Sequence, residues 1–123
     1  MNAISAGTVA VIFISQRTPH DPAGYTAAAA EMDAAAAAMP GYAGADFARD
    51  PDGFGITVSY WRDHAAAAAW RDDPRHREIQ ERGRARWYAS YAVYVADITR
   101  GYRWTDAMSR IETKKKASPE GWP

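Results

Sequence analysis

Two segments that are apolar on both faces constrain the fold of this chain most strongly. Residues 8–16 read Thr-Val-Ala-Val-Ile-Phe-Ile-Ser-Gln, and residues 88–99 are rich in Tyr, Val and Ala. Such runs are typical of strands that are covered on both sides. The second run is expected to place Tyr88, Ala92 and Tyr94 on one face and Tyr91, Val93 and Val95 on the other.

Helix and turn signals lie between these segments. Asp21-Pro22 and Asp73-Pro74 each place a capping carboxylate before a proline at the first helical position. Asp50-Pro51-Asp52-Gly53 is a hairpin signal that separates a weaker segment from a cleanly alternating one. These patterns predict strands over 8–16, 42–50, 54–61 and 88–99, and helices over 22–39, 63–71 and 74–86.

The order β-α-β-β-α-β is typical of an α+β fold with a four-stranded antiparallel sheet and its helices on one face. The helices leave the other face uncovered, although the first and last strands are apolar on both sides. A second copy of the sheet is the most economical cover. We therefore expect a homodimer whose sheets pack face to face and can close into a barrel.

Composition narrows the choice of partners. The chain has 123 residues, 15 basic and 15 acidic side chains, and no cysteine. Balanced charge gives no global attraction to nucleic acid or membranes, and the lack of cysteine excludes disulfides and thiolate metal sites. The longest apolar run, Val9 to Ile14, is too short to cross a bilayer, and no secretion signal is evident. We expect a cytoplasmic protein that binds neither nucleic acid nor membrane.

A pair of tryptophans marks the candidate site. Trp61 ends the strand 54–61 on the face that carries Thr57 and Ser59, and Trp70 follows among alanines. The small neighbours leave space beside the Trp61 indole, where a flat ligand can stack while Thr57 or Ser59 binds its oxygens. We expect Trp61 to wall a dry cleft beneath the paired sheets. Trp70 is a candidate ligand contact for which core packing is the competing interpretation.

The helix 74–86 carries the candidate catalytic residue on one stripe. At about 100° per residue, a narrow face is shared by His76, Ile79, Gln80 and Gly83, and Trp87 extends it. His76 is a candidate proton acceptor, and Gln80 and Trp87 are candidate substrate contacts. The competing interpretation is a histidine that only satisfies a backbone carbonyl. The three histidines form no metal motif, so no metal site is expected.

Longer stretches resemble the antibiotic biosynthesis monooxygenase family, which includes the haem-degrading monooxygenases. The resemblance is carried by Gly-Ile-Thr-Val-Ser-Tyr-Trp-Arg-Asp at 55–63, Ala-Trp-Arg at 69–71, Asp-Pro-Arg-His at 73–76 and Gly-Arg-Ala-Arg-Trp-Tyr at 83–88. It implies a ferredoxin-like domain over residues 1–100 that forms a dimeric α+β barrel. Residues 101–123 then form a C-terminal tail that can pack on the partner subunit.

The resemblance also implies roles for single residues. In the branch that oxidises polyketide anthrones without a cofactor, a tryptophan at the end of the third strand binds the substrate, and Trp61 has that position. The asparagine, tyrosine and arginine expected near it are Thr57, Ala67 and Gln80 here. In the haem-degrading branch, a tryptophan matching Trp70 precedes the axial histidine by ten residues, which again reaches Gln80.

These residues together predict O2-dependent oxidation of a small, planar, polyketide-like aromatic without metal or flavin, with His76 as proton acceptor and Trp61 as stacking wall. Haem binding or haem degradation, with His76 as the ligand, is one alternative. Another is a non-catalytic dimeric module that binds a metabolite. That module would have its cleft plugged by its own side chains, such as Trp104 or Trp122.

Overall fold

The two segments that are apolar on both faces become neighbouring strands. In the computed structural model, which describes residues 4–106, β1 (Val9–Arg17) pairs with β4 (Tyr88–Asp97) on one side and with β3 (Phe54–Trp61) on the other. The strand β2 (Tyr42–Arg49) pairs with β3 and forms the other edge. The sheet is antiparallel throughout and has the order β2-β3-β1-β4.

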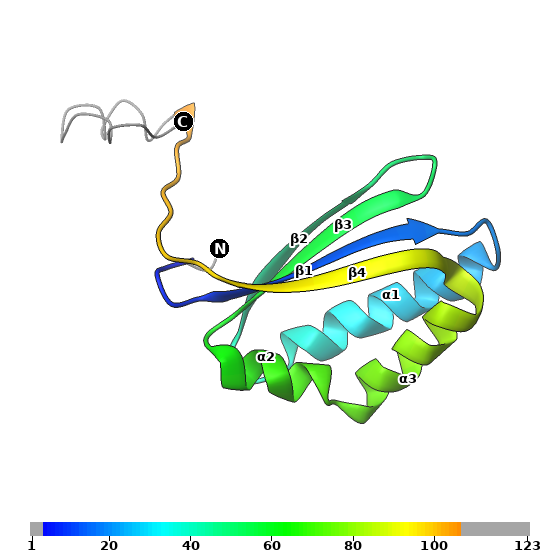
Figure 1. Cartoon of the computed structure of the whole chain (residues 1–123), viewed down its shortest axis with the longest axis horizontal. Coiled ribbons are helices and arrows are strands. Elements are labelled where there is room, and N and C mark those ends of the chain that lie inside the picture. Colours follow the sequence, from blue (N-terminus) through cyan, green and yellow to red (C-terminus); the bar gives the residue numbers. More distant parts are fainter. Residues whose placement is uncertain (1–3, 107–123) are drawn as a thin grey trace.

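Three helices cover one face of this sheet (Figure 1). They are α1 (Pro22–Ala37), α2 (His64–Arg71) and α3 (Pro74–Arg82). This arrangement confirms the predicted α+β fold of ferredoxin-like type. No helix within residues 4–106 is long and apolar enough to span a membrane. Beyond β4 the chain runs away from the helices up to residue 106 (Figure 1), and most of the predicted tail, residues 107–123, lies outside the described part.

Aspartate caps begin each helix, as the sequence predicts. Asp21 accepts a hydrogen bond from the Gly24 amide at 3.2 Å, and Asp63 accepts one from the Ala66 amide at 2.8 Å. Asp73 accepts from the amides of Arg75 and His76 at 3.0 and 3.1 Å. Each carboxylate thus satisfies amides that have no partner inside the helix.

The third helix ends earlier than the sequence predicts. Helix α3 stops at Arg82, and the next residues form a π-helical turn, η1 (Gly83–Trp87), which the Tyr88 amide closes by donating to the Gly83 carbonyl. A Cβ atom on Gly83 would lie 2.9 Å from two carbons of the Tyr88 ring. The turn therefore needs glycine at this position, because the Tyr88 ring packs directly against it.

A β-bulge changes the face of the sheet on which the first residue of β4 lies. Opposite β1, the partner of Gln16 is Ser90, whereas the partner of Arg17 is Tyr88, so one residue of β4 is skipped. Tyr88 is therefore turned to the face that carries Tyr91, and the two rings lie 6.0 Å apart. The expectation that Tyr88 shares a face with Ala92 and Tyr94 is wrong for this reason.

Large aromatic residues and alanines make the main core at the α2 end of the sheet. Trp61 is completely buried and Trp70 is 8% exposed. Alanines of α1 and α2 let the helices approach the sheet closely here. The buried cluster consists of Val9, Ala36, Trp61, Ala66, Ala67 and Trp70.

The other face of the sheet carries no helix and remains apolar (Figure 1). Phe54, Ile56 and Tyr94 are 45%, 40% and 57% exposed. The strand register places further apolar residues on this face, namely Ala10, Ile12, Ile14, Val58, Tyr60 and Ala92. This bare face is the one that the sequence predicts to be covered by a second copy.

Replacing Gly41 by alanine should destabilise the protein by about 2 kcal/mol or more, since strain and overpacking both contribute. Gly41 has a φ of +84°, and a Cβ there would lie 2.6 Å from the Ala66 Cβ atom in the core. Gly7 is the matched control, because it has a φ of +95° but open space around its Cβ position. Urea unfolding should show a clearly larger loss for Gly41→Ala than for Gly7→Ala. Equal losses would contradict the packing seen at Gly41.

Candidate functional site

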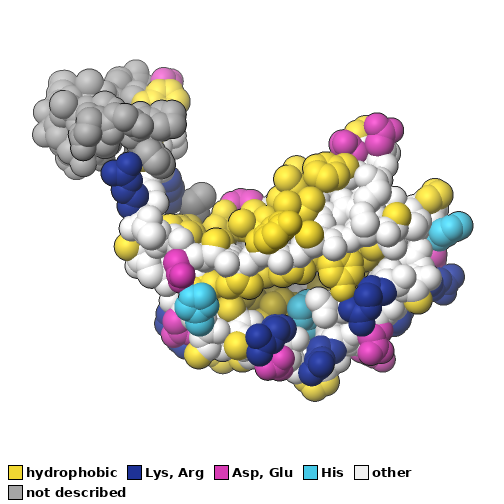
Figure 2. All heavy atoms as spheres, viewed as in Figure 1, with side chains coloured by type: hydrophobic (Ala, Val, Ile, Leu, Met, Phe, Trp, Pro, Cys, Tyr) yellow, Lys and Arg dark blue, Asp and Glu magenta, His cyan; other side chains and the backbone are white. Residues whose placement is uncertain are grey.

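A cavity of about 340 Å³ lies between the sheet and the helical layer. Figure 2 shows its mouth as a hollow beneath the near edge of the sheet, where apolar side chains gather. Figure 1 has the same orientation and shows that this edge is β4. This volume lies in the range of small-molecule sites. The sheet lines one side of the cavity with Val11, Phe13, Thr57, Ser59, Val93 and Val95.

Small side chains keep this space open. Ala28, Ala29 and Ala36 of α1 and Ala67 and Ala68 of α2 line it on the helical side. Opposite them, the sheet residues Thr57 and Ser59 have short polar side chains. Since neither layer fills the gap, an open space results.

This cavity is formed within a single subunit, between the sheet and its own helices, whereas the cleft expected from the sequence lies beneath paired sheets. Trp104 is 63% exposed and does not line the cavity, so it does not plug the space. Trp122 lies outside the described residues. An open, aromatic-walled cavity argues against a module plugged by its own side chains.

Trp61 does not form the expected wall. Its side chain is completely buried, its indole N–H donates to the Ser59 Oγ atom at 2.9 Å, and it does not line the cavity. Its ring stacks on that of Trp70, with centroids 6.1 Å apart and an interplanar angle of 22°. Trp70 lines the cavity and is therefore the wall, with Trp61 packed behind it. Trp70 packs in the core and also lines the cavity, so it stays a candidate ligand contact.

His76 stacks on the Trp70 wall. The two ring centroids are 4.4 Å apart with an interplanar angle of 18°. The His76 Nδ1 atom lies 3.0 Å from the Trp70 carbonyl oxygen. A carbonyl only accepts, so Nδ1 carries the proton in the neutral ring and Nε2 is the basic nitrogen. His76 thus satisfies a backbone carbonyl and also lines the cavity.

Burial favours the neutral form of this histidine. It lowers the pKa of His76 below its usual value near 6.5, although hydrogen bonds to the carbonyls of Trp70 and Arg71 and the charge of Asp73 oppose the shift. His76 is therefore unprotonated at neutral pH, as a proton acceptor must be.

The other candidate contacts come together around the same space. Gln80 lies one turn beyond His76 and lines the cavity with Thr57 and Ser59. The Ser59 hydroxyl accepts from the Trp61 indole and can still donate its own proton. Trp87 lines the cavity with its ring and is 2% exposed.

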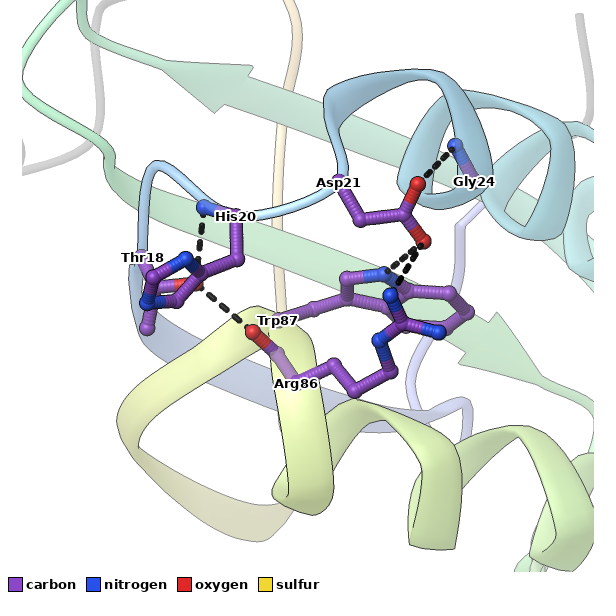
Figure 3. A network of polar contacts seen from close by, with 6 residues as sticks. All are labelled: Thr18, His20, Asp21, Gly24, Arg86 and Trp87. Atoms are coloured by element: carbon purple, nitrogen blue, oxygen red, sulfur yellow. Dashed lines mark hydrogen bonds and ion pairs between the residues drawn. The ribbon is translucent and has the colours of Figure 1, made fainter.

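Trp87 is fixed by the polar network of Figure 3. Its indole N–H donates to the Asp21 Oδ2 atom at 3.1 Å, and the Arg86 guanidinium lies 4.0 Å from the same oxygen. These contacts tie the π-turn to the start of α1. The hydrogen bond from Trp87, and then that from the Gly24 amide, hold the pKa of Asp21 below its usual range. The Trp87 N–H is occupied, so Trp87 can offer a ligand only the apolar part of its ring.

Sequence reasoning missed residues that long-range folding brings to the site. Tyr25 and Tyr88 line the cavity and pack edge to face, with centroids 6.0 Å apart. His64 also lines it, and its Nε2 atom lies 2.6 Å from the Asp97 Oδ1 atom. In the sequence Tyr25, Met32 and Met39 are seven residues apart, which places them on one helical stripe and was a usable signal. Nothing local connects His64 with Asp97. Within residues 4–106, no three His, Cys, Asp or Glu side chains are grouped as metal ligands.

His76 should make folding stability fall on mild acidification. With the folded-state pKa below 6.5, the unfolded chain binds this proton first, so stability is lost as the pH falls from about 6.5 towards the folded-state value. Urea unfolding at pH 7.5 and pH 5.5 should give a larger loss for wild type than for His76→Gln. Titration of the carboxylates contributes equally to the stability loss of both proteins, so it cancels in this comparison. Equal losses would show that the His76 pKa is not lowered.

The comparisons with known proteins agree with this architecture. The family model for the antibiotic biosynthesis monooxygenases matches residues 8–82. The uncharacterized protein YqjZ of Bacillus subtilis strain 168 is 45% identical over 91 residues, which cover 74% of this chain and 79% of that protein.

Two solved structures share the fold. One is a mutant form of SnoaB, a cofactor-independent oxygenase from Streptomyces nogalater, with a TM-score of 0.68, 18% identity, and coverage of 78% of this chain and 97% of that one. The other is a dimeric ferredoxin-like protein of unknown function from Thermobifida fusca, with a TM-score of 0.64, 13% identity, and coverage of 80% and 99%. With the family match, the conclusion follows that this chain belongs to the antibiotic biosynthesis monooxygenase family.

Proposed function

We propose that this protein is a cofactor-independent monooxygenase that oxidises a small, planar, electron-rich aromatic compound with O2. The observation that carries the proposal is the open apolar cavity in which a neutral histidine stacks on an indole wall. Such a space desolvates a flat molecule and holds its edge beside a base. The fold shared with SnoaB, itself described as a cofactor-independent oxygenase, supports this choice.

The proposed reaction needs no external reductant. His76 Nε2 accepts a proton from a ring C–H or O–H group, and the electron pair of that bond spreads over the aromatic system. The resulting anion transfers an electron to O2, and the two radicals combine to form a peroxide at the ring carbon. Loss of water then turns a ring methylene into a carbonyl. The balance is CH2 + O2 → C=O + H2O, with all four electrons supplied by the substrate.

The apolar environment supports this chemistry in two ways. The rings of Trp70, His76 and Trp87 line the space in which a planar substrate can lie. Thr57, Ser59 and Gln80 provide the few polar contacts that orient its oxygens. Because the Nδ1 proton of His76 is held by the Trp70 carbonyl, the basic Nε2 has a fixed orientation.

Haem binding is the second candidate, and one observation favours it. Metal-bound histidines commonly donate their other ring N–H to a carbonyl, and His76 is arranged in this way. Against it, the axial position implied by the family holds Gln80, and an amide is not among the usual haem ligands. A hemin titration separates the candidates, since histidine ligation would give a Soret shift that disappears in His76→Ala.

We also propose that two copies pack through the bare face of the sheet. Exposed apolar side chains at Phe54, Ile56 and Tyr94 would be removed from water there. The fold shared with the dimeric protein from Thermobifida fusca supports this arrangement. The cavity lies on the opposite face, so dimerisation would leave its mouth open.

Removing the base should abolish most of the activity. We expect His76→Gln to lower the rate of O2 consumption with a hydroxylated anthrone about 10²- to 10⁴-fold, because it removes the proton acceptor. His20→Gln is the control, since His20 is exposed and outside the cavity. Full activity in purified His76→Gln would remove His76 from the mechanism. A wild-type protein that consumes no O2 with any planar phenol or anthrone would contradict the proposed function.

Charge on the bare face should dissociate the dimer. In Ile56→Glu the carboxylate would need to be desolvated at the interface, so light scattering should report a monomer where wild type reports a dimer. Phe47→Glu is the matched control, because Phe47 is 71% exposed but pairs with Thr57 and so lies on the opposite face. A monomeric wild type, or an Ile56→Glu protein that stays dimeric, would contradict this interface.

A further inference from the structure

The far end of the cavity is built from two phenols. Tyr25 of α1 and Tyr88 of β4 both line it, and their rings are perpendicular. Phe13 holds the Tyr88 ring from the sheet, edge to face, with centroids 5.3 Å apart. The bulge in β4 and the π-turn before it place Tyr88 here. None of the mechanistic steps proposed above uses these hydroxyl groups.

Two guanidinium groups surround Tyr25. Arg49 Nη2 donates to the Tyr25 hydroxyl oxygen at 3.2 Å and to the Ser15 Oγ atom at 2.9 Å. The Arg17 Cζ atom lies 3.9 Å from the centroid of the Tyr25 ring. Gly55 makes room for this packing, since a Cβ atom there would lie 2.6 Å from the Arg49 Cζ atom.

Among residues 4–106, no carboxylate forms an ion pair with Arg17 or Arg49. Their other acceptors are neutral, as in the bond from Arg49 Nη1 to the Gly53 carbonyl at 2.6 Å. The Nε atoms of both arginines are buried without a hydrogen-bond partner. Two positive charges in a partly desolvated setting, without a matching anion, reduce the cost of negative charge at this end of the cavity, and both act in this direction on Tyr88.

The phenols are in the right state to bind an anion. The Tyr25 oxygen accepts a hydrogen bond from Arg49. As the acceptor in this bond, the Tyr25 hydroxyl keeps its own proton, with which it can donate to a ligand. A hydroxyl that accepts from a cation becomes a stronger donor. Burial raises the pKa of Tyr88, and the neighbouring Tyr25 raises it further, so Tyr88 keeps its proton.

We propose that Tyr25 and Tyr88 bind the oxyanion of the substrate, with Arg49 as the residue that positions the Tyr25 hydroxyl. This inference rests on the proposed function for the identity of the substrate, which becomes a planar phenol or an enolisable aromatic ketone. When His76 accepts the proton, the electron pair of the broken bond moves onto this oxygen. The hydrogen bond from the phenol pair stabilises the phenolate or enolate, which is the species that reduces O2.

The test uses 7-hydroxycoumarin, a planar phenol whose ionised form has its own absorption band. Spectra of the bound probe across pH give its apparent pKa in each protein without any turnover. We expect the pKa of the bound probe to be at least one unit lower in wild type than in Tyr25→Phe, which is about a tenfold preference for the anion. Tyr91→Phe is the matched control, because it removes a phenol from the same aromatic cluster but outside the cavity.

Arg49→Gln provides a second variant that leaves the cavity lining unchanged. It should raise the pKa of the bound probe in the same direction as Tyr25→Phe. The proposal is overturned if wild type and Tyr25→Phe give the same probe pKa, or if wild type binds only the neutral probe. Should Tyr25→Phe fail to fold, an unchanged probe pKa in Arg49→Gln overturns it equally.

The outcomes also separate this inference from the proposed function. His76→Gln should lose oxidation but still lower the pKa of the bound probe, because the oxyanion contacts are intact. A wild-type protein that lowers the probe pKa but oxidises nothing would refute the oxygenase and retain the oxyanion site. Oxidation that survives unchanged in Tyr25→Phe, with an unchanged probe pKa, would retain the oxygenase and refute the oxyanion site.

Discussion

The cavity depends on a contrast in side-chain size between the sheet and the helical layer. Trp61 and Trp70 pack between the layers at one end, and Trp87 and Tyr88 do so at the other. Between them the lining includes alanines on the helical side and the short side chains of Thr57 and Ser59 on the sheet side. The large rings hold the helices away from the sheet, and the small residues cannot close the gap. Every functional group of the site acquires its position from this spacing.

Such an arrangement has an energetic cost. An apolar space without packing partners loses dispersion contacts, and cavity formation is destabilising in proportion to volume. The buried guanidinium Nε atoms without partners add a further cost at the Tyr25 end. A planar ligand would relieve the first cost, since its ring would fill the gap.

The elements of the fold were predictable because their signals are local. The Asp-Pro caps, the turn at 50–53 and the alternating strands each involve neighbouring residues, and the structure has them where expected. The bulge opposite Arg17 and the π-turn at Gly83 were missed, because each depends on how Tyr88 packs against distant elements. These two irregularities bring Tyr88 into the cavity, so the sequence pattern alone misplaced its side chain.

The candidate site was predicted in part, for related reasons. Helical periodicity put His76 and Gln80 on one stripe, and both line the cavity. The role given to Trp61 relied on its small neighbours, but Trp70 stacks over Trp61 and lines the cavity in its place. Arg49 and Tyr25 lie 24 residues apart in the sequence and meet only because β2 and α1 pack in the same fold. No local pattern reveals such a contact.

A crystal structure with a planar phenol bound tests this account most directly. The account predicts electron density for the ligand between the sheet and the helical layer of one subunit, with its ring against Trp87 or against the His76 ring that stacks on Trp70, and its oxygen at the Tyr25 hydroxyl. Density only on the bare face of the sheet, or a cavity that has collapsed onto its own side chains, would contradict it.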